Sequence, residues 1–523
     1  MPEIAVYDAT LRDGAQGEGI NFSVEDKIAI ALKLDELGVA YIEGGFPFSN
    51  EKDIAFFAQI KKRPLKTARI VAFGSTRRAK LKVEEDAGLA ALLSAGTEAV
   101  AVVGKSWDLH VRDVLRTSLE ENAAMIADSV RYLKSKGLEV IFDAEHFFDG
   151  YRHNERYALS ALHAAREAGA DTIVLCDTNG GSLPSHVRAA TAAVMKEIGG
   201  RIGFHGHNDA GMAVANSVTA VEAGATHVQG TINGLGERTG NADLCQVVPN
   251  LQLKLQRRCL PGENLKLMTE TSRFIYDVAN MPLAVAQPFV GRAAFAHKGG
   301  LHVDAVRKNP ATYEHIEPQE VGNERRLLLS ELSGSATMLE KMAIHKLTHD
   351  PKIMRQALKQ LQSLENVGYQ FEAAEASFAL LVRRMLGKEK HFFDFEGFRV
   401  IVEKRDFSPE TITEATIKIR VGEVEELCAG EGDGPVNALD CALRKALERF
   451  YPSLHEMQLT DYKVRVINPD AGTAARVRVV IQSRDKDAIW GTVGVSENLI
   501  EASWQALVDS VVYKLTRDEE NAE

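Results

Sequence analysis

The chain has 523 residues, more than one ordinary hydrophobic core accommodates, so its length indicates two to four domains. Its net charge is -11 and no extended run of Lys and Arg interrupts the mixed composition, which argues against nucleic acid and anionic membranes as partners. Five widely spaced cysteines, no leader-like N-terminus and no apolar run of membrane-spanning length predict a reduced, cytoplasmic protein without membrane contact.

The first 255 residues alternate short β-branched runs with amphipathic helical stretches. Ser23 and Asp26 form a predicted capping box that opens one such helix, and Gly38 ends it. The eight predicted strands span residues 4–10, 41–46, 69–75, 99–105, 139–147, 172–178, 201–207 and 227–234. Strict βα alternation requires a parallel sheet, and eight units of this size predict a closed (β/α)8 TIM barrel. A doubly wound sheet is the alternative, but no Gly-x-Gly-x-x-Gly follows the first strand.

After the barrel the pattern changes twice. We expect the barrel at 1–260, a helical linker subdomain with a glycine-rich break at 261–394, and an α+β C-terminal regulatory domain at 395–523. In the last part, three strand-like runs and a helix occur in the same order twice, which predicts a repeated βββα unit. Its predicted elements are strands 398–405, 413–421 and 424–429 before helix 435–450, and strands 459–468, 474–484 and 489–495 before helix 498–516.

Polar groups gather where the predicted barrel strands end, which is where active sites of such barrels are built. His205 and His207 stand at i and i+2 of a predicted strand, so their imidazoles point to one face and could bind one metal ion. The spacing alone also fits two hydrogen-bonded histidines, so a carboxylate must come from elsewhere. Further candidates at the strand ends are Asp8, Arg12, Asp13, Gln16, Asp143, Glu145, Asp177, Thr178, Asn179 and the loop 233–241. For Asp8, Asp177 and Asn179 we favour turn and capping roles.

Three segments resemble the signatures of the isopropylmalate/homocitrate/citramalate synthase family. They are 10–16 (TLRDGAQ), 205–209 (HGHND) and 234–241 (GLGERTGN), and the resemblance spans essentially the whole chain. Within the family, segments 104–111 (GKSWDLHV), 143–150 (DAEHFFDG) and 175–181 (LCDTNGG) are most similar to its bacterial citramalate branch.

The resemblance implies an enzyme that joins acetyl-CoA to the ketone of a 2-oxo acid, pyruvate in the citramalate branch, and then hydrolyses the thioester. It implies that Asp13, His205 and His207 bind a divalent metal ion, with Asn241 completing or adjoining the shell. Such an ion polarises the acceptor carbonyl. Zn²⁺ suits the imidazoles, while Mn²⁺ or Mg²⁺ suits the oxygen ligands, so the sequence does not decide the identity of the metal. Arg12 would stabilise developing negative charge, with a salt bridge to Glu145 or Asp143 as its structural role.

The same resemblance assigns roles beyond the metal. His302 corresponds to the family's base, with Glu145 nearby, and Gln16, Thr178 and Tyr313 correspond to substrate-binding positions. In that family the linker of one subunit covers the barrel of its partner, which implies a homodimer with a cross-subunit active site.

Three questions stay open at the level of sequence. An isopropylmalate or homocitrate synthase would differ from a citramalate synthase only in the side chains of the acceptor pocket, which the sequence does not reveal. A lyase on a similar barrel is a further alternative. A hypothesis of another class is a catalytically inactive amino-acid sensor. In the C-terminal domain, Gly432 and Gly434 precede a helix start marked by Pro435, a place that suits a carboxylate; by resemblance we expect isoleucine, or else leucine, as an effector.

Overall fold

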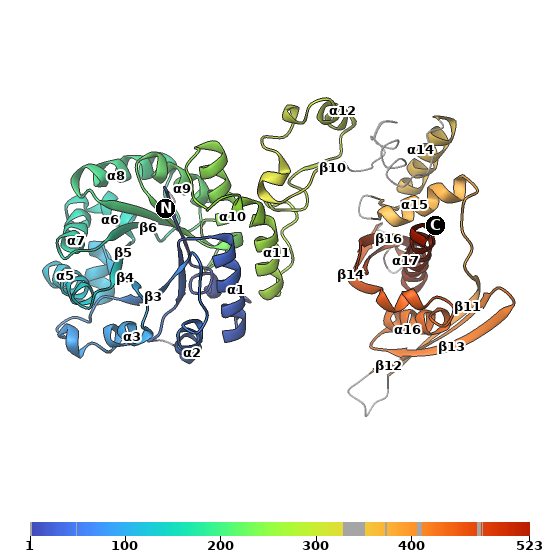
Figure 1. Ribbon diagram of the computed structural model, residues 1–523, viewed down its shortest axis with the longest axis horizontal. Coiled ribbons are helices and arrows are strands. Elements are labelled where there is room, and N and C mark those ends of the chain that lie inside the picture. Colours follow the sequence, from blue (N-terminus) through green and yellow to red (C-terminus); the bar gives the residue numbers. More distant parts are fainter. Residues whose placement is uncertain are drawn as a thin grey trace. The chain divides into compact units, whose positions relative to one another are not determined.

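The structure is a computed structural model of the chain (Figure 1) and describes residues 3–48, 50–327, 351–371, 374–404, 411–467, 472 and 474–522. The chain forms two compact units, Met1–Phe295 with Glu314–Arg325, and Ala296–Tyr313 with Arg326–Glu523. Within the described residues, no helix combines the length and the apolar character needed to cross a bilayer.

The first unit contains a closed parallel barrel in which each strand pairs with the next along the chain and β8 pairs with β1. The strands are β1 Ala5–Asp8, β2 Tyr41–Gly45, β3 Arg69–Ser75, β4 Ala99–Lys105, β5 Glu139–Glu145, β6 Thr172–Asp177, β7 Arg201–Gly206 and β8 His227–Gly230. All eight predicted strands are present, so the predicted TIM barrel is confirmed. Several strands are shorter than predicted, most clearly strand 1, expected at 4–10, and strand 8, expected at 227–234. Strand 5 was expected to reach residue 147, but β5 ends at Glu145 and His146 takes a left-handed conformation (φ 58°) before a helix begins at Phe147.

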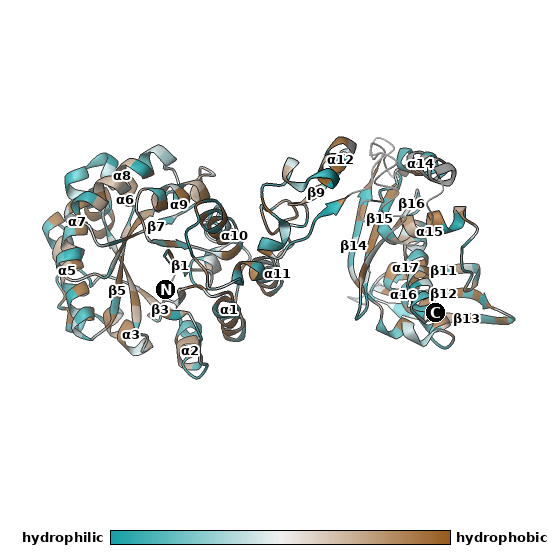
Figure 2. Cartoon of the chain, turned by 45° about the horizontal axis from the view of Figure 1, so that its top comes forward, coloured by the Kyte–Doolittle hydropathy of each residue, from teal (hydrophilic) through white to brown (hydrophobic). Residues whose placement is uncertain are grey.

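Helices surround the barrel and turn their apolar residues toward the strands (Figure 2). They are α1 Val24–Leu37, α2 Glu51–Ile60, α3 Ala87–Ala95, α4 Asp108–His110, α5 Leu119–Ser135, α6 Phe147–His153, α7 Glu155–Glu167, α8 Pro184–Glu197, α9 Ala213–Glu222, α10 Leu244–Pro249 and α11 Met268–Val278. The predicted capping box is present, because Ser23 accepts from the Asp26 amide while the Asp26 side chain accepts from the Ser23 amide. Gly38 ends α1 with φ 93°, a conformation that favours glycine.

Two apolar layers follow from the alternation along each strand. One lies between the strands and the helices, and a smaller one fills the barrel interior. The interior layer contains Tyr7, Tyr41, Val71, Ala99, Ala101, Ile141, Val174 and Cys176, all buried. The barrel is therefore a packed core, and its polar side chains collect at the strand ends.

The second unit begins with short elements of the predicted linker. They are β9 Ala296–His297, α12 Gly300–Lys308, β10 Arg326–Leu327, α14 Pro351–Asn366 and α15 Glu375–Met385. The parallel pairing of β9 with β10 was not predicted. Residues 328–350 of the predicted linker lie outside the described residues.

The repeated βββα unit is confirmed in the C-terminal part. Each copy is a three-stranded antiparallel sheet packed against one helix. The copies are β11 Asp394–Lys404, β12 Thr411–Val421, β13 Val424–Gly432 and α16 Pro435–Leu447, then β14 Gln458–Val466, β15 Val477–Arg484, β16 Ile489–Ser496 and α17 Leu499–Ala522. The predicted strand ends at 405 and 468 lie outside the described residues.

The two glycines proposed for effector binding have different structural positions. A Cβ on Gly432 would lie 2.5 Å from the Ala438 amide nitrogen, so glycine is needed there for β13 to approach α16. Gly434 is the N-cap of α16 in an extended conformation (φ -168°) that any residue adopts. Close packing therefore explains the glycine at position 432 without a ligand. The roles of Gly432 and Gly434 in effector binding remain predictions.

Candidate active site

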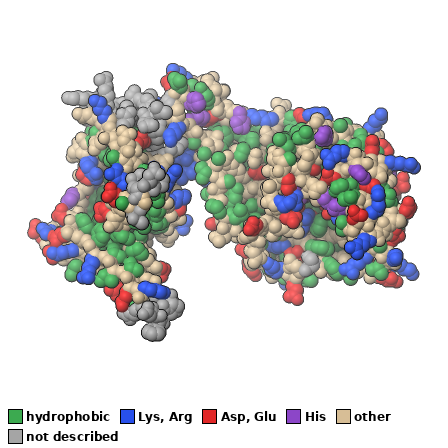
Figure 3. Space-filling model, turned by 180° about the vertical axis from the view of Figure 1, so that it is seen from behind, with side chains coloured by type: hydrophobic (Ala, Val, Ile, Leu, Met, Phe, Trp, Pro, Cys, Tyr) green, Lys and Arg blue, Asp and Glu red, His purple; other side chains and the backbone are tan. Residues whose placement is uncertain are grey.

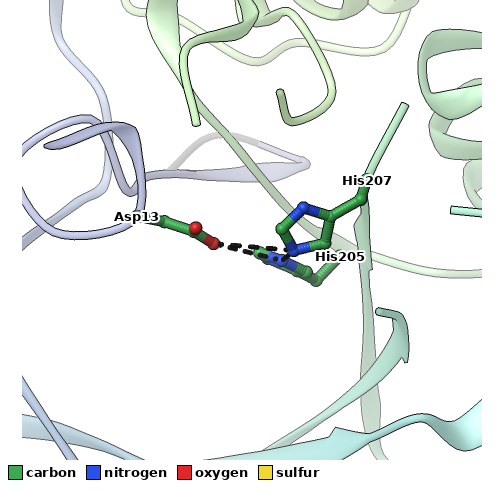
Figure 4. A group of neighbouring side chains, drawn as sticks. All are labelled: Asp13, His205 and His207. Carbon is green, nitrogen blue, oxygen red and sulfur yellow. Dashed lines mark hydrogen bonds and ion pairs between the residues drawn. The ribbon is translucent and has the colours of Figure 1, made fainter. Parts of the chain in front are cut away.

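Asp13, His205 and His207 converge at the mouth of the barrel (Figure 4). Asp13 follows β1, and the two histidines lie on and just after β7. The two Nε2 atoms are 3.3 Å apart, and Asp13 Oδ2 lies 3.5 Å from His205 Nε2 and 3.9 Å from His207 Nε2. All three side chains are buried. Strand alternation therefore brings the two imidazoles to one side, as the i, i+2 spacing predicts.

The electrostatics of the cluster suit a cation. Burial lowers the pKa of His205 to about 3 and also lowers that of His207, so both rings are neutral near pH 7. Burial alone would raise the pKa of Asp13, but the charge of Arg12, together with His205, His207 and a hydrogen bond from Asn241, outweighs burial and the pKa falls. Two imidazole nitrogens and one carboxylate oxygen thus face one another, and an ion between them would satisfy all three.

Asn241 adjoins the cluster on the loop after β8. Asn241 is 2% exposed, and its backbone pairs with that of His207 in an isolated antiparallel β-bridge. Its Nδ2 donates to the Leu235 carbonyl (3.1 Å), while its Oδ1 is buried without a hydrogen-bond partner among the described residues. An unsatisfied buried oxygen beside this cluster fits a further metal ligand.

Gln229 on β8 orients His205 from inside the barrel. Its Oε1 lies 3.0 Å from His205 Nδ1, and its Nε2 donates to Asp143 Oδ1 at 3.1 Å. Burial raises the pKa of Asp143 to about 8, so this side chain is protonated near neutrality. With Gln229 Oε1 accepting from Nδ1–H, the lone pair of His205 Nε2 points at the cluster.

Arg12 lies beside the cluster and is held by a carboxylate from the next strand. Its Nε donates to Glu43 Oε2 at 2.8 Å, and Glu43 Oε1 accepts from the Tyr7 hydroxyl at 2.9 Å. The guanidinium carbon lies 3.9 Å from the centre of the Phe73 ring. Although burial opposes the charge, Glu43 raises the pKa of Arg12, so a permanent cation stands at the barrel mouth.

Comparison of the sequence with models of known protein families identifies the family of the barrel that carries this site. The HMGL-like family model matches residues 3–275. The chain belongs to the HMGL-like family. Two further models match behind the HMGL-like region, a homocitrate synthase post-HMGL domain-like model over 289–368 and the LeuA allosteric (dimerisation) domain over 372–515.

Relatives of this HMGL-like chain match it from end to end. An (R)-citramalate synthase of Aquifex aeolicus is 54% identical and one of Geobacter sulfurreducens 53% identical, each alignment covering 99% of both proteins. A probable 2-isopropylmalate synthase of Methanopyrus kandleri is 32% identical over 98% of both chains. The citramalate synthases are therefore considerably more similar to this chain than this isopropylmalate synthase.

The structure places the other predicted barrel residues of this HMGL-like chain as follows. Glu145 ends β5 and forms an ion pair with Lys105 on β4. Thr178 follows β6, and its Oγ1 accepts from the His146 amide at 2.9 Å. Gln16 is exposed and, with Arg12, lines a cavity of about 230 Å³ at the ends of the first three strands.

His302 and Tyr313 belong to the second unit. Their rings stack with centroids 4.1 Å apart, so the structure brings these two predicted residues together. Their action in the barrel of a partner subunit stays a prediction.

Sequence reasoning missed the partner of Arg12. It named Glu145 or Asp143 for the salt bridge, but Arg12 pairs with Glu43 at 2.8 Å, because β2 lies next to β1 in the barrel, and with Asp13 at 3.6 Å. A signal was present, since Glu43 is an acid within an otherwise apolar predicted strand. Asp8 and Asp177 have the expected local roles: Asp8 accepts from Thr10 and Asp177 from Ser182.

Proposed function

We propose that the chain is a citramalate synthase, which condenses acetyl-CoA with pyruvate and hydrolyses the thioester to release citramalate and coenzyme A. The observation that carries the proposal is the buried Asp13, His205 and His207 cluster beside a permanently charged Arg12. Full-length similarity to (R)-citramalate synthases supports pyruvate as the acceptor.

The donor set proposed for the metal is Asp13, His205 and His207, with Asn241 adjoining. A divalent ion held there would supply a Lewis acid and a template for a 2-oxo acid that chelates through carboxylate and ketone oxygens. Neutral imidazoles and an ionised carboxylate are the protonation states that such binding requires. We expect Zn²⁺, Mn²⁺ or Mg²⁺, to be distinguished by elemental analysis of the purified protein and by restoring activity after chelation.

Arg12 and Thr178 would orient the acceptor. The guanidinium, fixed by Glu43 and Phe73, presents its remaining N–H groups to oxygen atoms that gain negative charge during the reaction. The Thr178 oxygen already accepts from the His146 amide, so its hydroxyl hydrogen is available to donate to the acceptor carboxylate. Gln16 would contact the substrate from the adjoining cavity.

Removal of a proton from the acetyl methyl group requires a base, which we assign to His302, supplied by the partner subunit. Glu145 at the barrel mouth would assist it, and Tyr313 would hold the imidazole by the stacking seen within the second unit. The methyl carbon then bonds to the ketone carbon, the former ketone oxygen takes a proton, and water cleaves the thioester.

The test is release of free thiol from acetyl-CoA with a panel of 2-oxo acids. Pyruvate should give the highest kcat/KM, well above 2-oxoisovalerate and 2-oxoglutarate. Preference for either of those acids would reassign the chain to isopropylmalate or homocitrate synthesis, and cleavage of citramalate without net synthesis would favour a lyase. Absence of thiol release with every acid, from metal-loaded protein, would favour the inactive sensor.

For the C-terminal domain we propose a dimer that binds isoleucine, or else leucine, near Gly432 and Gly434. The match to the LeuA allosteric (dimerisation) domain supports this assignment. Inhibition should reduce kcat at saturating pyruvate, because the effector would act through a coupling free energy and not by competition. Inhibition that excess pyruvate fully reverses, or no amino-acid binding by calorimetry, would refute it.

A further inference from the structure

A short basic segment connects α2 to β3 on the face of the barrel where the strands begin. Residues 61–69 (KKRPLKTAR) contain five Lys and Arg and no acid, within a chain of net charge -11. Within the described part of the chain, the side chains of Lys61, Lys62, Arg63 and Lys66 form neither an ion pair nor a hydrogen bond. Over the face drawn in Figure 3, by contrast, basic and acidic side chains are interspersed. These four side chains are therefore a local excess of uncompensated positive charge, whereas Arg69 at the end of the segment pairs with Glu139.

A buried carboxylate fixes the backbone of this segment. Asp35 on α1 is 7% exposed, and its oxygens accept from the amides of Lys66, Thr67 and Ala68, each at 2.8 Å. Pro64 further restricts the chain. Because the backbone is ordered in advance, binding a ligand here would sacrifice little conformational entropy.

The basic side chains line a cavity of about 410 Å³, within the size range of small-molecule sites. Four cations, Lys61, Arg63, Lys66 and Arg69, face it against a single acid, Glu98. Its apolar lining includes Phe57, Ile60, Ala68 and Ala95, which are all buried. The cavity thus combines a cationic rim with an apolar floor.

A second cavity of about 580 Å³ adjoins the first and shares Thr67 and Arg69 with it. Arg201 and Arg258 add guanidinium groups to this second cavity, and Glu3 adds an acid. Cations after a helix also stabilise its C-terminal end, which accounts for Lys61 and Lys62 after α2. That role does not account for Lys66, which forms no ion pair among the described residues. Arg69 and Arg201 have a carboxylate partner of their own, because both pair with Glu139, Arg201 at 3.6 Å.

We infer that these cavities form a binding site for a phosphorylated small molecule of the nucleotide class. Phosphate groups match the unpaired side chains of Lys61, Arg63 and Lys66, and a base with a planar apolar face matches the floor formed by Phe57 and Ile60. Arg69 and Arg201 are the first residues of β3 and β7, whereas the Asp13, His205 and His207 cluster lies at the strand ends. The ligand would consequently be an effector and not a substrate.

The test is calorimetric titration of the full-length protein with ATP, and with adenosine as the uncharged comparison. Wild-type protein should bind ATP, and adding salt should weaken binding because the phosphate contacts are screened. Lys66→Glu should weaken ATP binding at least about tenfold, since it replaces a phosphate contact with a repulsive charge. Lys66 is remote from the catalytic cluster, so thiol release without ATP should not change.

Lys62→Glu is the matched control, because Lys62 carries the same charge in the same segment but lines neither cavity. It should reduce ATP affinity by less than about threefold through general electrostatics alone. Equal weakening by both substitutions would reduce the proposal to diffuse attraction and overturn it. Absence of ATP binding to the wild type, or adenosine binding as tight as ATP binding, would also overturn it.

Discussion

At the scale of single residues, His205 and His207 are neutral imidazoles whose Nε2 atoms face a carboxylate and each other. Burial removes water from their ring nitrogens and lowers both pKa values, so protonation would not satisfy them near pH 7. A buried polar group without a partner costs about 1–3 kcal/mol. Metal binding would turn this unfavourable arrangement into a stabilising one.

We predict that His207→Ala lowers metal content and reduces thiol release at least about a hundredfold, because one of few ligands is lost. Elemental analysis and the thiol assay measure the two effects, and circular dichroism should show an intact fold. His163→Ala is the control, since His163 lies on the surface in a pair with Glu197. Full activity of thoroughly chelated wild-type enzyme would contradict the metal assignment.

A second prediction concerns Arg12→Lys, which keeps the charge but removes the planar group held between Glu43 and Phe73. An ammonium cannot contact Glu43 and a substrate oxygen in the same geometry, so kcat should fall at least about a hundredfold. Steady-state kinetics measure the loss, with Arg188→Lys on the barrel surface as the control. Near wild-type kcat would show that Arg12 is only structural.

At the scale of elements, the loop after β8 carries Asn241 and is anchored from outside the barrel. Asn233 takes a left-handed conformation (φ 64°), and its Oδ1 accepts from Ser272 Oγ at 2.5 Å and from Gln287 Nε2 at 3.2 Å. Gln287 Nε2 also donates to Asp243 at 2.8 Å. Both ends of the loop are thus bound to one buried amide.

We predict that Gln287→Leu weakens metal affinity by roughly 10-fold to 100-fold, because Asn233 and Asp243 lose a shared donor and Asn241 loses its fixed position. Competition with a chromophoric chelator measures the affinity. Gln319→Leu, at an exposed position of the same unit, should leave it unchanged. A lower melting temperature with normal metal affinity would limit Gln287 to a role in stability.

The C-terminal elements provide a prediction about pH. Asp509 on α17 accepts from Ser377 on α15 at 2.6 Å, and burial raises its pKa to about 6 from 3.8. The native state therefore binds this proton more tightly than the unfolded chain, and its stabilising contribution disappears as pH rises from about 4 to about 6. Asp509→Asn should remove that step and stabilise the unit at pH 7.5 relative to wild type. Thermal unfolding at pH 5 and pH 7.5 measures it, and identical pH dependence in both proteins would contradict the prediction.

At the scale of the whole molecule, the proposed chemistry draws on both units. The Asp13, His205 and His207 cluster and Arg12 belong to the first unit, and His302 and Tyr313 belong to the second. A homodimer in which each second unit serves the partner's barrel would bring them together, and C2 symmetry would make two equivalent sites.

We predict that mixing inactive His302→Ala and inactive His205→Ala subunits restores activity, to about a quarter of wild type after random exchange. In each hybrid, one site combines an intact barrel with an intact His302. Native mass spectrometry verifies that hybrids form, and either variant mixed with itself is the control. Hybrids that form but stay inactive would place His302 in its own subunit or outside catalysis.

The sequence by itself determined the barrel, because β-branched runs alternated with amphipathic helical stretches eight times, and capping signals such as Ser23 and Gly38 marked helix ends. It also determined the repeated βββα unit, since alternation and Pro435 are local features. His205 and His207 were predictable as a pair because two residues along a strand share a face.

Only the tertiary structure decided which residues of different strands contact one another, because neither the spacing of residues nor the composition encodes these contacts. Glu43, and not Glu145, holds Arg12, because closure of the barrel places β2 beside β1. Gln229 orients His205 because β8 lies beside β7, and Lys66 and Arg201 line two neighbouring cavities at the strand starts. Such pairings depend on strand register and closure, which are set by the packing of the whole barrel and not by any local segment.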